Sequence, residues 1–188
     1  MPDEVRDLVR RGLAKDEAAL AELVERFGGQ VFGLCYRLLG HRQDAEDVTQ
    51  ESFVRAFRSL ASWDNSRDFV PWLLAIAGNR CRSWLAARLR RPRPTDEVDH
   101  LPDRAPDYQQ ARHLAEEVDL ALASLRDEYR QAFVLFHEHH LSYAEIAVAM
   151  SCPLGTVKTW VHRARRQLAD DLRRRGVVEE NYHAVRRI

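Results

Sequence analysis

The chain has 188 residues, 45% of them hydrophobic, and a formal net charge of zero at pH 7. This length allows one medium domain or two small ones, and the neutral balance excludes a uniformly basic coat for nucleic acid. No run of about eighteen apolar residues predicts a membrane span and the acidic N-terminus is unlike a signal peptide, so we expect a cytoplasmic protein without direct membrane insertion. Cys35, Cys81 and Cys152 form no CxxC pair and predict neither a disulfide framework nor a zinc module.

The first half of the chain has the apolar spacing of amphipathic helices. Three stripes recur at steps of three and four residues: Leu20, Leu23, Phe27, Val31, Leu34 and Leu38; Phe53, Phe57 and Leu60; and Phe69, Trp72, Leu73, Ile76, Ala77 and Trp84. The second helix is predicted to start near Asp44, whose carboxylate suits the positive end of a helix dipole. Nothing in this half alternates with a period of two. Residues 1–91 are therefore predicted to form an antiparallel helical bundle.

A segment rich in proline and acidic residues divides the chain. Residues 92–111 have almost no apolar periodicity and cannot form a core, so they are predicted to be a flexible linker. Beyond it, two further helices are marked by Leu114, Val118, Leu122 and Leu125, and by Tyr129, Phe133 and Phe136. The second half is thus predicted to be a separate helical domain at residues 112–175, with a C-terminal tail at 176–188.

The end of this domain has the pattern helix, short turn, helix. Ser142 and Glu145 have the spacing of a capping box, and a turn is predicted over residues 151–155. The last helix has an inward stripe of Val157, Val161, Ala164 and Leu168. The predicted fold is all-α: two small helical domains joined by a flexible linker, the C-terminal one with a helix-turn-helix.

The opposite face of the last helix carries groups that bond base edges and phosphates. They are Lys158, Thr159, His162, Arg163 and Arg166. From Cys152 to Arg175 seven positive side chains stand against two carboxylates. A helix with this face is suited to the major groove of DNA. The alternative is a solvated basic face on an ordinary helical hairpin.

Three sequence blocks together resemble the extracytoplasmic-function (ECF) sigma factors of bacterial RNA polymerase. DAEDVTQESFVRAFRSL is similar to the helix that binds core polymerase, FVPWLLAIAGNRCRSWL to the promoter-melting helix, and LSYAEIAVAMSCPLGTVKTWVHRARRQL to the helix-turn-helix that reads the minus-thirty-five element. The blocks occur in family order on both sides of the linker. The resemblance implies a transcription initiation factor whose partners are core RNA polymerase, promoter DNA and an anti-sigma protein.

The resemblance assigns the polymerase contact to one face of the second helix. Asp44, Asp47, Gln50, Glu51 and Arg55 share or border this face, which in the family docks on a basic coiled coil of the largest polymerase subunit. The alternative is a solvated acidic face with internal ion pairs, including one from Glu51 to Arg55.

The loop before the third helix aligns with the family loop that captures a flipped base of the minus-ten element. Stacking and polar groups of the kind that hold single-stranded DNA are offered by Trp63, Asn65, Ser66, Arg67, Phe69 and Asn79. Arg80 and Arg88, with Arg82, Arg90 and Arg91, would follow the duplex upstream. Asn65 replaces a usual glycine, which we expect to be tolerated because asparagine adopts left-handed backbone angles, and Arg67 replaces a usual small residue. Trp63 and Phe69 are equally open to a role as core aromatics.

Other features predict no further chemistry. Trp160 is expected to pack beside Val157 and Val161 rather than to contact DNA. His137 and His140 lie one turn apart but have no third partner, so no metal is predicted, and no catalytic residues, cofactor or small-molecule substrate are expected. Two rival functions remain at this point: a conventional helix-turn-helix regulator that binds duplex DNA without polymerase, and a sigma-mimicking adaptor that sequesters an anti-sigma factor.

Overall fold

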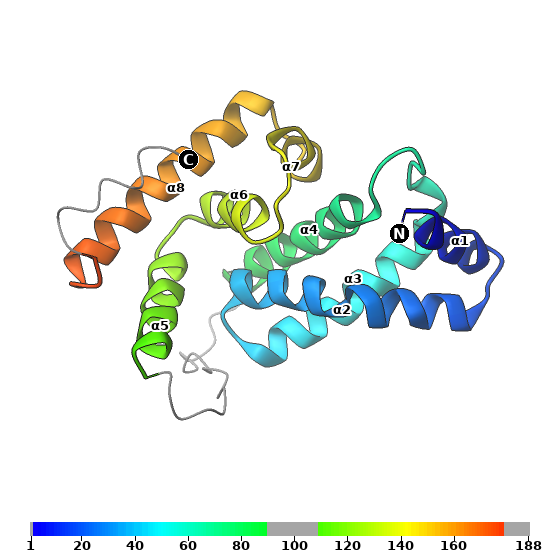
Figure 1. Cartoon of the computed structure of the whole chain (residues 1–188), viewed down its shortest axis with the longest axis horizontal. Coiled ribbons are helices and arrows are strands. Elements are labelled where there is room, and N and C mark those ends of the chain that lie inside the picture. The colour runs from blue at the N-terminus through cyan, green and yellow to red at the C-terminus, as the bar shows by residue number, and fades with distance from the viewer. Residues whose placement is uncertain (1, 90–108, 179–188) are drawn as a thin grey trace.

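In the computed structural model, residues 2–89 and 109–178 are described, and within these ranges every regular element is a helix (Figure 1). The elements are α1 (Pro2–Leu13), α2 (Glu17–Leu39), α3 (Arg42–Arg58), the 3-10 turn η1 (Leu60–Ser62), α4 (Phe69–Leu89), α5 (Gln109–Ala123), α6 (Asp127–His137), α7 (Tyr143–Ala149) and α8 (Leu154–Arg174). The predicted all-α class is confirmed. No helix in the described ranges is long and apolar enough to cross a membrane.

The described residues omit most of the predicted linker and the end of the tail. Residues 90–108, with Arg90 and Arg91, and residues 179–188 lie outside them. The helix after the linker begins at Gln109, which is three residues before the start predicted for the second domain.

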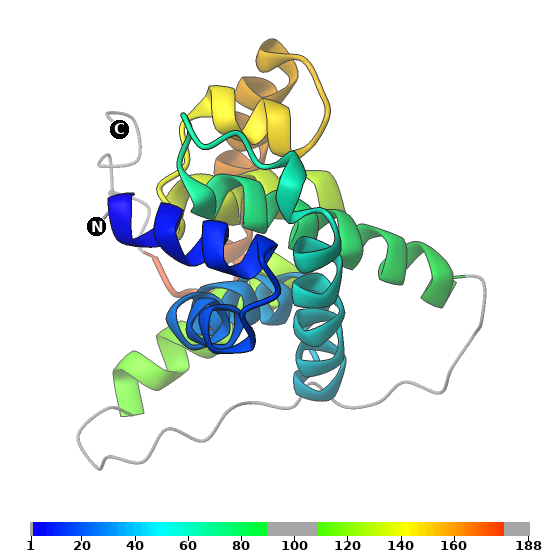
Figure 2. The same ribbon diagram turned by 90° about the vertical axis from the view of Figure 1, so that its right-hand side faces the viewer.

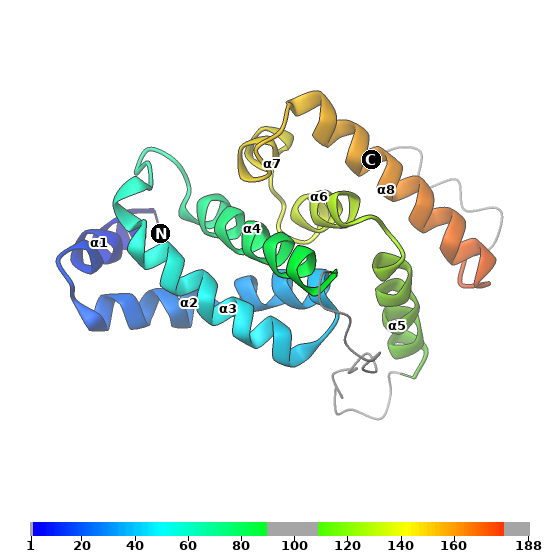
Figure 3. The ribbon, with the colours of Figure 1, turned by 180° about the vertical axis from the view of Figure 1, so that it is seen from behind.

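Helix α2 is the central element of the N-terminal half, and its ends are set by local sequence. The Asp16 carboxylate caps its start by accepting hydrogen bonds from the backbone N–H groups of Ala18 and Ala19, at 3.0 and 3.2 Å. Its end is closed by Gly40, whose left-handed φ of 71° favours a residue without a Cβ. Leu23, Phe27, Val31, Leu34 and Leu38 are buried, as the apolar stripe predicted. Helices α3 and α4 pack along this face (Figure 3).

The C-terminal half contains the predicted helix-turn-helix. Ser142 and Glu145 form the reciprocal capping box that starts α7. Val157, Val161, Ala164 and Leu168 of α8 are all buried. The turn ends two residues earlier than expected, because Leu154 and Gly155 already belong to α8.

Helix α5 departs from its predicted stripe at its start, and it ends before the last residue of that stripe. Leu114 was expected to face inward but is 50% exposed, and Leu125 is buried although it lies beyond the end of the helix. The apolar cluster that joins α5 to α8 includes Val118 but not Leu114, which lies one turn nearer the start of α5.

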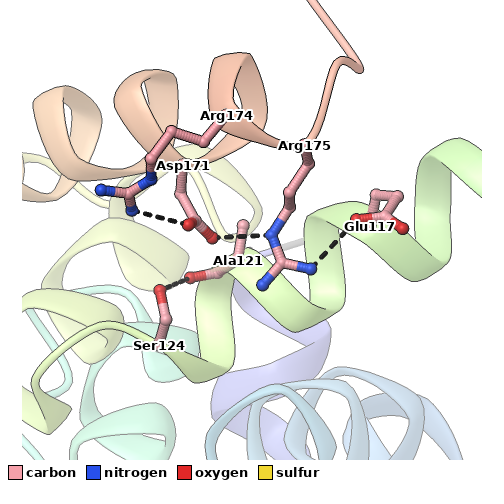
Figure 4. Close-up of polar contacts among 6 residues, drawn as sticks. All are labelled: Glu117, Ala121, Ser124, Asp171, Arg174 and Arg175. Carbon is pink, nitrogen blue, oxygen red and sulfur yellow. Dashed lines mark hydrogen bonds and ion pairs between the residues drawn. The ribbon is translucent and has the colours of Figure 1, made fainter.

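An ion-pair cluster joins α5 to the end of α8 (Figure 4). The buried Asp171 carboxylate accepts hydrogen bonds from Arg174 and Arg175, at 2.8 and 2.9 Å. Arg175 also donates to Glu117 of α5, at 3.1 Å. Arg175, about one-third exposed, therefore ties the end of α8 to α5, whereas the Arg174 side chain remains 74% exposed.

The two halves of the chain pack against each other. Helix α4 lies against α7, and α2 contacts α6 (Figures 1 and 2). One buried apolar cluster runs from Leu23 and Leu73 in the first half to Ile146 and Val161 in the second. A smaller cluster joins α5, α6 and α8. The sequence suggested a core for each half, whereas much of the apolar interior is continuous between them.

Candidate nucleic-acid and protein interfaces

The acidic face of α3 opens into a groove that it shares with α4. The groove has a volume of about 1030 Å³. Its lining includes Asp47, Gln50, Glu51 and Arg55 from α3, and Asn79 and Arg80 from α4. Two sets of residues that the sequence assigned to different partners therefore lie on one surface. Asp44 does not line this groove and is only 16% exposed at its side chain.

Ion pairs connect the two sides of this surface. The Glu51 carboxylate accepts a hydrogen bond from Arg80 Nε, and Asp44 pairs with Arg88 at 3.4 Å. The Arg88 guanidinium also lies over the Trp84 ring, 5.2 Å from its centroid. The hydrogen bond from Arg80 holds the pKa of the Glu51 carboxyl below its usual range, and Arg55 contributes a weaker influence. The alternative of a solvated acidic face predicted an ion pair between Glu51 and Arg55 along α3. The structure instead pairs Glu51 with Arg80 of α4.

The loop between η1 and α4 is organised by Asp64, which the sequence analysis did not single out. Its carboxylate accepts hydrogen bonds from the backbone N–H and the hydroxyl of Ser66, at 3.0 and 2.7 Å, and pairs with Arg67 at 3.3 Å. The bonds from Ser66 lower the pKa of Asp64. In the sequence, this turn is indicated by the spacing Asp-x-Ser, which is typical of an Asx turn.

Asn65 is exposed in this loop and does not use the backbone conformation expected of it. Among the described non-glycine residues, positive φ values occur at Lys15, His140 and Ser151, and Asn65 is not one of them. The backbone carbonyl of Asn65 accepts a hydrogen bond from Arg6 Nε at 3.0 Å, which ties the loop to α1. Because residue 65 does not adopt a left-handed conformation, this position does not require glycine.

The two aromatic residues of the loop differ in burial. Phe69 is only 4% exposed, and its ring centroid lies 5.3 Å from those of Phe27, Trp63 and Trp72. Trp63 is partly buried and lines a pocket beside the loop. Both rings border the pocket, but Phe69 is buried in the apolar core whereas Trp63 is partly exposed. On α4, the Asn79 side chain accepts a hydrogen bond from Arg82.

The predicted DNA-reading face of α8 is exposed along its whole length. The side chains of Lys158, Thr159, His162, Arg163 and Arg166 all lie in exposed positions. Two of them also have internal partners: the Thr159 hydroxyl donates to the Gly155 carbonyl at 2.9 Å, and Arg163 donates to the Tyr129 hydroxyl at 2.9 Å. The Arg163 hydrogen bond lowers the pKa of Tyr129. Trp160 packs against both apolar clusters, as expected.

His137, near the end of α6, has polar and aromatic partners. Arg165 Nε donates to His137 Nε2 at 3.0 Å, and burial lowers the pKa of His137. The His137 ring also contacts Phe133 and Phe136, with centroids at 4.4 and 4.9 Å. In the part of the chain that the structure describes, no group of three histidine, cysteine or carboxylate side chains is placed to hold a metal ion.

Both halves of the chain match models of known protein families. Residues 23–91 match Sigma-70 region 2, and residues 115–168 match Sigma-70 region 4. These ranges contain the α3–α4 groove and the helix-turn-helix.

Individual relatives cover most of the chain. It is 32% identical over 177 residues to the ECF RNA polymerase sigma factor SigW of Bacillus subtilis, a match that covers 84% of this chain and 91% of SigW. It is 38% identical over 165 residues to the ECF RNA polymerase sigma factor SigE of Mycolicibacterium smegmatis, covering 84% of this chain but only 64% of that longer protein.

A solved structure shares the fold. The sigma factor RpoE of Bartonella quintana, in complex with the anti-sigma factor NepR, superposes with a TM-score of 0.67 at 22% sequence identity, over 81% of this chain and 96% of that one. Together with the relatives, the arrangement of regions 2 and 4 identifies the family: the chain belongs to the ECF RNA polymerase sigma factors, which are transcription initiation factors.

Proposed function

We propose that this protein binds core RNA polymerase through the acidic face of α3 and directs it to promoters. The observation that carries the proposal is the α3–α4 groove, where Asp47 and Glu51 adjoin Asn79 and Arg80. A basic coiled coil on the polymerase complements the carboxylates of α3, while the amide and guanidinium of α4 suit DNA. One surface thus brings the promoter strand next to the polymerase.

The exposed face of α8 provides upstream recognition. Lys158, His162 and Arg166 project from a helix whose opposite side is packed into the core. Inserted into the major groove, such a helix contacts base edges with its first turns and phosphates with its later ones. We assign the minus-thirty-five element to this face.

The loop around Trp63 provides promoter melting. Asp64 holds Ser66 and Arg67 in one compact turn next to the partly buried Trp63 ring, so the loop is preorganised. Capture of an unstacked base costs a few kcal/mol, which stacking and hydrogen bonding on such a platform offset. Opening is therefore driven by strand capture, with no covalent reaction on this chain.

An anti-sigma protein is proposed as the regulatory partner. The Bartonella quintana protein with the same fold is held in a complex with an anti-sigma factor. Binding of such a partner across the two halves would prevent α3 and α8 from reaching polymerase and DNA at the same time.

Transcription in vitro tests the proposal. The purified protein is added to sigma-free bacterial core polymerase on a library of randomised promoters, beside the variant Asp47→Arg. The matched control is Glu25→Arg, because Glu25 is an exposed carboxylate on α2 that lies outside the α3–α4 groove. We expect run-off products that share an upstream and a melting element, lost with Asp47→Arg and retained with Glu25→Arg.

The rival functions give different outcomes. Tight duplex binding by the protein alone, with no product from active core, would support a conventional helix-turn-helix regulator. Absence of both activities, with retained binding to an anti-sigma protein, would support a sigma-mimicking adaptor.

A further inference from the structure

The pocket beside the proposed melting loop is formed by both halves of the chain. Its volume is about 530 Å³. Its walls include Phe27, Trp63 and Phe69 from the N-terminal half, and His139, His140 and Leu141 from the segment between α6 and α7. This segment, residues 139–141, is called the α6–α7 segment below. The pocket beside the loop proposed to capture an unstacked base is therefore partly walled by the half of the chain proposed to read the upstream element.

The α6–α7 segment packs tightly against the N-terminal half through Leu141. Leu141 is 4% exposed and belongs to the same apolar cluster as Phe69. Its backbone N–H donates to the Leu135 carbonyl at 3.1 Å, which holds the segment against the end of α6. His140, at a φ of 55°, makes the left-handed turn that directs the chain back toward the pocket. The local backbone is thus shaped for this contact.

Ion pairs close the rim of the same interface. Arg37 at the end of α2 pairs with Asp119 of α5, and its Nε lies 3.1 Å from a carboxylate oxygen of Glu138, just before the α6–α7 segment. All three side chains are about one-third exposed. A single arginine of the first half therefore binds two carboxylates of the second.

The interior of the interface contains polar atoms without partners. Gln131 of α6 is 1% exposed, and neither atom of its amide has a hydrogen-bond partner. The amide lies so close to Gly78 of α4 that a Cβ at residue 78 would collide with it. Trp63 Nε1 and His139 Nε2, on the two sides of the pocket, are likewise buried without partners. Separation of the halves would expose these groups to water, which can supply their hydrogen bonds.

We propose that the α6–α7 segment and an unstacked promoter base compete for this pocket, so that the closed arrangement is a self-inhibited state of the free chain. This inference rests on the proposed function, which assigns capture of an unstacked base to the loop beside the pocket. A base enters such a site together with its neighbouring nucleotides, and the strand cannot approach while α7 packs against α4. Separation of the halves both frees the pocket and releases α8 toward the upstream element.

Reversal of the charge at the rim tests the competition. In Arg37→Glu the new carboxylate faces Asp119 and Glu138 and should open the interface. Arg37 lies outside both the α3–α4 groove and the pocket. Binding of a fluorescently labelled pool of random-sequence single-stranded DNA to the free protein is expected to strengthen about tenfold, since the apparent affinity scales with the fraction of open molecules. Loss of a positive charge alone would weaken binding, so the direction is diagnostic.

Three further variants complete the experiment. Arg10→Glu makes the same charge change at an exposed ion pair within α1 and should not strengthen binding. Adding Asp119→Arg and Glu138→Arg to Arg37→Glu restores opposite charges and should return the affinity toward that of the original protein. Gln131→Leu removes two unpartnered polar atoms from the interface and is expected to weaken DNA binding by holding it closed.

The radius of gyration from small-angle X-ray scattering gives the second readout. Expansion of Arg37→Glu without stronger DNA binding would overturn the competition, and so would an unchanged radius with unchanged binding. Transcription with core polymerase is measured on the same variants. If the original protein fails to transcribe, the proposed function fails, whereas retained transcription with no effect of Arg37→Glu on the free protein overturns only this inference.

Discussion

Glu51 of α3 and Arg80 of α4 form an ion pair across the groove that unites the proposed polymerase and promoter surfaces. In the free protein, a carboxylate assigned to the polymerase is therefore neutralised by a guanidinium assigned to DNA. Under the proposed function, a basic coiled coil docking on α3 would compete with Arg80 for Glu51. Docking would then make Arg80 available to a phosphate of the promoter.

Removal of the arginine should separate the two affinities. In Arg80→Gln we expect weaker binding to single-stranded promoter DNA but unchanged or stronger binding to core polymerase, by no more than about fivefold because exposed pairs contribute only ~0.2–1 kcal/mol. Fluorescence anisotropy with labelled protein measures both. Arg42→Gln is the control, since it breaks a pair with Glu46 elsewhere on α3. A parallel loss of both affinities in Arg80→Gln would contradict the separation.

The same ion pair predicts acid sensitivity. The pKa of Glu51 is lowered in the folded protein, so its contribution to the free energy of unfolding is present above the ordinary carboxyl pKa and disappears as pH falls through the lowered value. Glu51→Gln should be less stable than the original protein near neutral pH, and the difference should shrink between about pH 6 and pH 3. Urea unfolding at several pH values measures it. A difference that does not change with pH would mean that the ionised carboxylate contributes nothing specific to stability.

Recognition by α8 predicts a salt-dependent loss. Arg166→Ala should weaken binding of the polymerase holoenzyme to duplex upstream DNA and, if it removes one phosphate contact, reduce the slope of log K against log salt by about one. Arg173→Ala is the matched control on the same helix, because Arg173 pairs with Asp170. Equal slopes for the two variants would remove Arg166 from the phosphate contacts.

The helix-turn-helix could be predicted because its determinants are local. The buried stripe from Val157 to Leu168 and the capping box at Ser142 are properties of a few consecutive residues, and the structure contains both. The pairing of Glu51 with Arg80 depends on how α4 lies against α3, which periodicity does not specify. The α6–α7 segment packs on residues that are still more distant in sequence, such as Phe69. The prediction that Leu114 faces inward was wrong because the apolar stripe of α5 extends past the surface that packs on α8.

The capping box itself yields a prediction about stability. Ser142→Ala removes the side-chain acceptor for the Glu145 N–H, and the Glu145 carboxylate loses one of its two donors on Ser142. Loss of such a cap costs about 1 kcal/mol, which corresponds to a fall of about 2–4 °C in Tm for a chain of this size. Thr159→Ala serves as the control, because its hydroxyl donates a hydrogen bond to the Gly155 carbonyl of α8 rather than accepting one from an uncapped backbone N–H. Hydrogen exchange should accelerate first in α7, and since α7 packs on α4, the closed arrangement should loosen as well. An unchanged Tm together with unchanged exchange in α7 would mean that tertiary packing alone, without the cap, holds this helix in place.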